Sequence, residues 1–242
     1  MVPPWFALGF ATILIGLSKC GVPGLSVLIA PLFAVATPGR ASTGLLLPLL
    51  IVGDVCAVAF YRRHAVWKHL IRLFPFAAVG IVAGYFAMGR ITDSQFGPIV
   101  GVITLVILAV NFWRSRRAAT QDAPPSRIWF AALFGLAGGF ATMIANAAGA
   151  IMLVYLISMR LPKDEFIGTS AWYFFALNVF KIPFSLALGF ITAPSLGLNL
   201  RLAPLVAVGA VAGYFLARRI PQSVFNIVVQ ILAAASAVFL IL

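Results

Sequence analysis

Charged residues are scarce in this chain of 242 residues. Lysine and arginine number 17 and aspartate and glutamate only 5, so charged side chains make up 9% of the sequence, against about 25% in soluble globular proteins. Hydrophobic residues make up 63%, and a soluble fold could not cover so much apolar side chain with so few charges. The scarcity excludes disorder, collagen and an ordinary soluble enzyme. It leaves an all-α polytopic membrane protein.

Cysteine and catalytic motifs are equally sparse. The two cysteines, Cys20 and Cys56, lie inside apolar runs and give neither a disulfide framework nor a CxxC metal site. HExxH, GxSxG, Walker A and GxGxxG patterns are absent from the sequence. We therefore expect no enzymatic activity, no cofactor and no metal. The net charge of +12 falls almost entirely in short gaps between apolar runs, where it orients a membrane protein, so nucleic acid is not an expected partner.

Eight apolar runs are present, at 5–36, 41–61, 73–89, 96–113, 128–159, 167–192, 202–217 and 223–242. The runs 5–36 and 128–159 are too long for one straight span, since 32 helical residues reach ~48 Å across a ~30 Å hydrocarbon core. Each has a helix-breaking or small-residue centre, at 21–24 and at 146–149. Both runs are therefore predicted to be broken helical hairpins, each made of two short helices that meet near the middle of the bilayer.

The chain also repeats itself. Segment 75–91 matches segment 204–220 at 11 of 17 positions. A weaker match at an offset of 124 pairs Pro38 with Pro162, Gly44 with Gly168 and Asp54 with Asn178. We predict two four-segment repeats, 1–113 and 128–242, joined by a basic cytoplasmic linker at 114–127. Such repeats are typical of secondary transporters, whose site lies at the repeat interface.

The orientation of the repeats can be judged from basic residues in the gaps. Eight simple spans would place nine basic residues on one side and six on the other, whereas two hairpins plus six spans give twelve against three. The positive-inside rule favours the second arrangement, with two inverted repeats, each a broken hairpin plus three transmembrane helices, and both termini outside. Eight simple spans remain the alternative. Recurring small residues at a spacing of four, such as Gly80/Gly84, Gly97/Gly101, Gly135/Gly139 and Gly209/Gly213, favour close helix packing.

Three charged residues lie inside the apolar runs, where a charge is costly and functional by default. Lys19 stands beside the first break and is predicted to face an anion, the alternative being a lysine that snorkels to the interface. Lys181 shares a helix face with Asn178 and is predicted to serve the same site, the alternative being a structural pair with Asp54. Asp54 should approach its repeat partner Asn178, and it either neutralises one lysine or couples proton movement to transport.

Uncharged polar residues complete the predicted site. Asn146 and Thr142 at the second break could donate hydrogen bonds to an oxyanion, or they could simply join helices. Weaker candidates for substrate binding are Ser18, Cys20 and Ser170. His64 and His69 lie in a basic gap and are interpreted as interfacial rather than as metal ligands.

Four stretches resemble the TauE/SafE sulfite-exporter family: GLSKCGVPG at 16–24, ANAAG at 145–149, GTSAW at 168–172 and NVFKIP at 178–183. The resemblance covers nearly the whole chain. It implies a small bacterial inner-membrane permease for sulfite, organosulfonates or related anions. The chain departs from the family at the first break, where Cys-Gly-Val-Pro-Gly replaces a longer glycine run.

The sequence therefore predicts a multi-pass secondary transporter that exports a small anion. Export needs no further coupling, because one anionic charge leaving a negative cytoplasm gains about 2.3 kcal/mol per 100 mV. The expected partners are a small anionic substrate, a sulfur oxyanion or sulfonate, and the lipid bilayer, with a homodimer left open. The alternative is a non-transporting membrane partner that acts in assembly or biogenesis.

Overall fold

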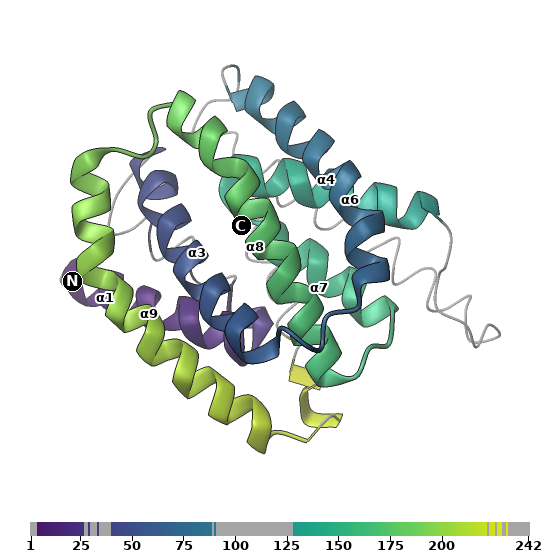
Figure 1. Ribbon diagram of the computed structural model, residues 1–242. Coiled ribbons are helices and arrows are strands. Elements are labelled where there is room, and N and C mark those ends of the chain that lie inside the picture. The colour runs from purple at the N-terminus through teal and green to yellow at the C-terminus, as the bar shows by residue number, and fades with distance from the viewer. Residues whose placement is uncertain are drawn as a thin grey trace.

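The computed structural model describes residues 4–26, 29, 33, 40–88, 90, 128–221, 223–225, 227–228 and 231. Within these ranges every regular element is a helix (Figure 1): α1 (Pro4–Cys20), η1 (Pro23–Leu25), α3 (Arg40–Tyr61), α4 (Trp67–Met88), α6 (Ile128–Ala145), α7 (Ala148–Ser158), α8 (Lys163–Ala187) and α9 (Ala193–Arg219). The all-α class is thus confirmed for the described part of the chain. The run 96–113, most of 223–242 and the linker 114–127 lie outside it.

Three of the described helices are long and apolar enough to cross a membrane, within Gly44–Tyr61, Trp67–Met88 and Ala193–Arg219. Large apolar side chains point outward from the bundle: Phe10 is 58% exposed, Phe86 69% and Leu200 78%. In water, extended apolar surface of this kind would drive association, whereas lipid tails accommodate it. Helix length and surface composition both indicate a membrane protein.

Both long runs are broken at the predicted positions. Helix α1 ends at Cys20 and the single turn η1 starts at Pro23, while α6 ends at Ala145 and α7 starts at Ala148. The expectation of two short helices is wrong for the first arm of each run. Helices α1 and α6 have 17 and 18 residues, which is about 25–27 Å at 1.5 Å per residue. The helices have this length because the helix-breaking residues come that many residues after the start of each run.

Two helices begin earlier than the apolar pattern predicts. Helix α4 starts at Trp67 rather than 73, and α9 starts at Ala193 rather than 202. Arg201, assigned from the sequence to a gap, therefore lies inside α9. With 27 residues, α9 is about 40 Å long and extends beyond a ~30 Å hydrocarbon core, so its first turns can carry polar residues into the interface. Thr192 and Ser195 start it with a reciprocal capping box.

Helices α3 and α8 lie side by side in the centre, between the α1–α9 pair on one flank and the α4–α6 pair on the other (Figure 1). The two central helices are antiparallel. Gly168, near the start of α8, packs on the backbone of Tyr61 and His64 at the end of α3. Gly44, near the start of α3, packs on Phe190, which follows α8. Helices α3 and α8 therefore run in opposite directions past one another.

Glycines allow the two helices within each flanking pair to pack closely against one another. A methyl group on Gly16 of α1 would overlap the backbone of Val206 and Ala210 in α9, and one on Gly139 of α6 would overlap the backbone of Ala77 in α4. Gly80, Gly84, Gly135, Gly209 and Gly213 have similarly close neighbours. The predicted packing role is confirmed for these positions, while Gly97 and Gly101 lie outside the described residues.

We expect Gly16→Ala and Gly139→Ala to destabilise the protein by about 1–3 kcal/mol each, because added side-chain atoms force the packed helices apart. Thermal unfolding of the purified protein in detergent, followed by tryptophan fluorescence, measures the effect. Gly197→Ala is the control, since a methyl group there meets open space in helix α9, the helix on which Gly16 packs. Equal melting temperatures for all three variants would contradict the packing argument.

Candidate functional site

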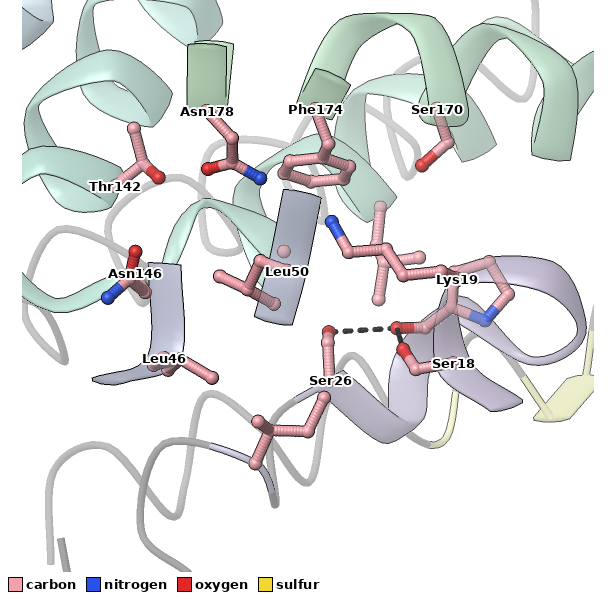
Figure 2. Close-up of a pocket in the computed structure, with 14 residues that line it drawn as sticks. Ser18, Lys19, Ser26, Leu46, Leu50, Thr142, Asn146, Ser170, Phe174 and Asn178 are labelled. Atoms are coloured by element: carbon pink, nitrogen blue, oxygen red, sulfur yellow. Dashed lines mark hydrogen bonds between the residues drawn. The ribbon is translucent and has the colours of Figure 1, made fainter. Parts of the chain in front are cut away.

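The first break is held by its own hydroxyl groups. The N–H of Gly21 donates to Leu17 O at 2.9 Å and closes helix α1. Ser18 Oγ and Ser26 Oγ both donate to Pro23 O, at 3.1 and 2.8 Å (Figure 2). Local sequence chemistry therefore fixes the break, because Pro23 lacks an N–H and cannot continue the helix bond pattern. Lys19 lies in the last turn of α1, directly before this fixed segment.

The second break depends on one residue with left-handed backbone. Asn146 has φ 53°, a region that asparagine tolerates better than most residues and that commonly ends a helix. Its N–H donates to Thr142 O at 3.1 Å. Helix α7 then begins at Ala148, and its N-cap Ala147 provides no side-chain cap.

The two helix breaks lie next to one another. A methyl group on Gly149, in the first turn of α7, would come within 2.6 Å of Ser26 Oγ beside the first break. A side chain at position 149 would require the Ser26 hydroxyl to move, so the two segments lie in close contact. Two segments more than 100 residues apart in the chain therefore form one structural unit.

A cavity of about 40 Å³ lies between the breaks (Figure 2). On a scale where one water needs about 10–15 Å³, it has room for about three waters. Its polar wall consists of Ser18, Lys19, Ser26, Thr142, Asn146, Ser170 and Asn178. All of these except Ser26 are site residues predicted from the sequence, and they come from both helix breaks and from α8. Apolar side chains, among them Leu50 and Phe174, form the rest of the wall.

The Lys19 ammonium is directed into this interior and not toward a headgroup region. Its Nζ lies 2.6 Å from Asp54 Oδ1, and its side chain is 10% exposed while that of Asp54 is fully buried. The ammonium also lies 4.2 Å from the centre of the Phe174 ring (Figure 2), within cation–π range. Of the two lysines that Asp54 was predicted to neutralise, Lys19 is therefore its partner.

Asp54 also joins the two central helices, α3 and α8. Asn178 Nδ2 donates to Asp54 Oδ2 at 2.6 Å, and both side chains are buried. The predicted approach of Asp54 and Asn178 is confirmed. A continuous polar chain now runs from α1 through α3 to α8, by way of Lys19, Asp54 and Asn178.

Lys181 takes a different position from the one expected. Its Nζ donates to Thr142 O at 2.9 Å, to Thr142 Oγ1 at 3.1 Å and to Asn146 Oδ1 at 2.5 Å. It is 1% exposed and does not belong to the cavity wall. Cys20, another predicted site residue, is also fully buried away from that wall. The structure thus brings Lys181 to the second break and leaves Lys19 as the lysine beside the cavity.

Sequence reasoning missed Ser26, Gly149 and Phe174. A usable signal existed for Phe174, which stands four residues before Asn178 and so shares its helix face. Ser26 follows Pro23 by three residues, a spacing that lets its hydroxyl reach back to the proline carbonyl. Gly149 gave no such signal, because its neighbour Ser26 lies more than 100 residues away in the chain.

An all-helical bundle with lipid-facing apolar sides, two broken helices and a buried ammonium beside an internal cavity belongs to the class of polytopic membrane transporters. The family model described as Sulfite exporter TauE/SafE matches residues 6–240, and the chain belongs to this family. Neither the curated proteins nor the solved structures include a match to the chain. Family membership and the apolar helices together indicate membrane transport of an anion.

Proposed function

We propose that the protein is a secondary transporter that exports a small anion, such as sulfite or an organosulfonate, across the bacterial inner membrane. The observation that carries this proposal is the Lys19 ammonium beside a cavity bounded by both helix breaks. The start of α7, whose N-cap has no side-chain cap, adds backbone N–H groups and a positive helix end at the same cavity. Ammonium, amide and hydroxyl donors suit an oxyanion.

The size of the cavity favours a compact anion. Room for about three waters corresponds to a solute of a few heavy atoms, such as sulfite. Leu50 and Phe174 limit the space on the apolar sides. A longer organosulfonate would have to displace one of these side chains, so we place sulfite first among the candidate substrates.

Two inverted repeats, 1–113 and 128–242, separated by a cytoplasmic linker at 114–127, provide the proposed framework. The antiparallel course of the equivalent helices α3 and α8 supports the inversion. Trp172 in α8 donates to Arg62 O at 3.4 Å, and Lys163 donates to Ala217 O at 2.7 Å. These contacts favour one shared membrane side for the 62–65 turn, the start of α8 and the end of α9. The eight-span alternative would place the 62–65 turn on the opposite side from the other two, so the Trp172 contact discriminates against it. We assign this basic side to the cytoplasm.

Asp54 is the proposed coupling residue. An anion that binds Lys19 has to compete with the Asp54 carboxylate for the same ammonium. A proton on Asp54 removes that competition, so anion and proton binding favour one another. The membrane potential, worth about 2.3 kcal/mol per charge per 100 mV, acts on the anion in the direction of export.

Flux measurements in proteoliposomes test the function. At 100 mV, inside negative, and equal pH, a sulfite dianion that leaves together with one proton carries one net negative charge and should reach an outside-to-inside ratio of about 50-fold. Sulfate, taurine, sulfoacetate and chloride are compared in the same vesicles, with protein-free liposomes as the control. We expect sulfite flux well above the control and weaker flux of the longer sulfonates. No flux of any of these anions, together with no anion-dependent thermal stabilisation, would instead support a non-transporting assembly or biogenesis partner.

A further inference from the structure

Lys181 is a buried cation whose bonding capacity is already used within the protein. An ammonium carries three donors and no acceptor, and three acceptor atoms of Thr142 and Asn146 lie within hydrogen-bond distance of its Nζ. With 1% of its surface exposed, Lys181 has no donor to spare for a solute. We propose that Lys181 is a positioning residue: it fixes the second helix break and turns the Asn146 amide so that its N–H donor serves the anion. This inference rests on the proposed anion-binding function.

The backbone of the break is tied to this lysine. Thr142 O, in the last turn of helix α6, accepts the i→i−4 bond from the Asn146 N–H and a second bond from Lys181 Nζ. Asn146 adopts a left-handed backbone that only a few per cent of non-glycine residues use. Because Lys181 belongs to α8, it ties the break to a neighbouring long helix and holds this conformation from outside.

The Lys181 ammonium also fixes the orientation of the Asn146 side-chain amide. An amide has one end that accepts and one that donates, and an ammonium can bond only to the accepting oxygen. Asn146 Oδ1 therefore faces Lys181, which leaves Nδ2 as the end that can reach other groups. Asn146 lines the cavity, and an oxyanion there requires donors. Without Lys181 the amide could rotate and present its oxygen, which repels an anion.

Lys19 and Lys181 therefore have different tasks. Within the described residues, the Lys19 ammonium forms an ion pair with Asp54. Lys19 also lines the cavity. Lys181 lies behind Asn146, one residue removed from the cavity. In this arrangement Lys19 supplies charge to the anion, whereas Lys181 acts through the neutral amide.

A double-mutant cycle separates positioning from direct contact. Purified full-length Lys181→Met, Asn146→Gly and the double variant are titrated with sulfite, and Kd is taken from ligand-dependent thermal shifts. Glycine suits the left-handed backbone, so Asn146→Gly removes the amide and keeps the fold. We expect each single variant to weaken sulfite binding about tenfold or more. The double variant should be no weaker than either single one, because both changes remove the same donor.

The control is Lys163→Met, which removes a lysine that also donates to backbone carbonyls but lies away from the cavity; its sulfite Kd should stay unchanged. Losses that multiply in the Lys181/Asn146 double variant would mean that Lys181 touches the anion itself and would overturn the proposal. If Lys181→Met does not fold, Asn146→Asp decides, since it keeps an oxygen for Lys181 and removes the donor: wild-type sulfite affinity in that variant also overturns it. Absence of sulfite binding by the wild-type protein would instead reject the proposed function.

Discussion

Lys19→Met is expected to abolish sulfite efflux, with a loss of about 100-fold or more in initial rate. The substitution removes the ammonium that lies beside the cavity and with it the charge-assisted bond to the anion. It also leaves Asp54 buried without its ion-pair partner, and breaking a buried pair in this way costs about 3–5 kcal/mol of stability. Efflux from sulfite-loaded proteoliposomes at 100 mV measures transport, and thermal unfolding in detergent measures stability.

The double variant Lys19→Met with Asp54→Asn separates these two effects. It removes both charges of the pair, so no unpaired charge remains in the interior and most of the lost stability should return. Transport should not return, because the ammonium is still missing. If the stable double variant exported sulfite at the wild-type rate, Lys19 would not be a ligand of the anion.

The sequence predicted the polar centre because charged residues inside a membrane are energetically unfavourable and therefore conspicuous in an apolar run. Charges are rare in apolar runs because lipid disfavours them, so Lys19, Asp54 and Lys181 were visible at once. The repeat then paired Asp54 with Asn178, and the structure joins these two side chains at 2.6 Å. Helix breaks could be located for a similar reason, since Pro23 and Asn146 stand where an apolar run exceeds the thickness of a bilayer.

The partners of each charge could not be predicted in the same way. Which acceptor Lys181 reaches depends on the rotation of α8 relative to α6, and hydropathy carries no information on that angle. Phe174 could be assigned to the face of Asn178 from its spacing, but its contact with the Lys19 ammonium could not be predicted from the sequence. Helix ends such as Trp67 and Ala193 were missed because polar residues in an interface can still be helical.

The two helix breaks are packed in similar ways and differ in where a lysine lies. Helix α1, which ends at the first break, packs on α9, and α6, which ends at the second break, packs on α4. At the first break Lys19 lies in the broken helix itself and pairs with Asp54 of the long helix α3. At the second break Lys181 lies on the long helix α8 and bonds to Asn146 of the break. The first break therefore carries a charge, and the second carries neutral polar groups.

Asp54→Asn is expected to abolish transport driven by a proton gradient. The amide cannot take up a proton, so proton binding can no longer free Lys19, whereas the anion can still reach the ammonium. With the membrane potential clamped at zero and acid on the sulfite-loaded side, we expect the wild type to release sulfite about tenfold faster than at equal pH, for a coupling of about 1.4 kcal/mol. The variant should show no such acceleration, while sulfite exchange between the two sides at equal pH persists.

The exchange measurement makes this result specific. A variant that had merely unfolded would lose both sulfite exchange and gradient-driven flux. Loss of coupling would remove only the gradient-driven flux. Asn178→Ala is the companion variant, since it removes the neutral partner of the same carboxylate and leaves the proton acceptor in place. It should keep the acceleration by acid. If acid still accelerated sulfite release in Asp54→Asn, Asp54 would not be the residue that couples proton binding to transport. Its role would then be to hold Lys19 in place.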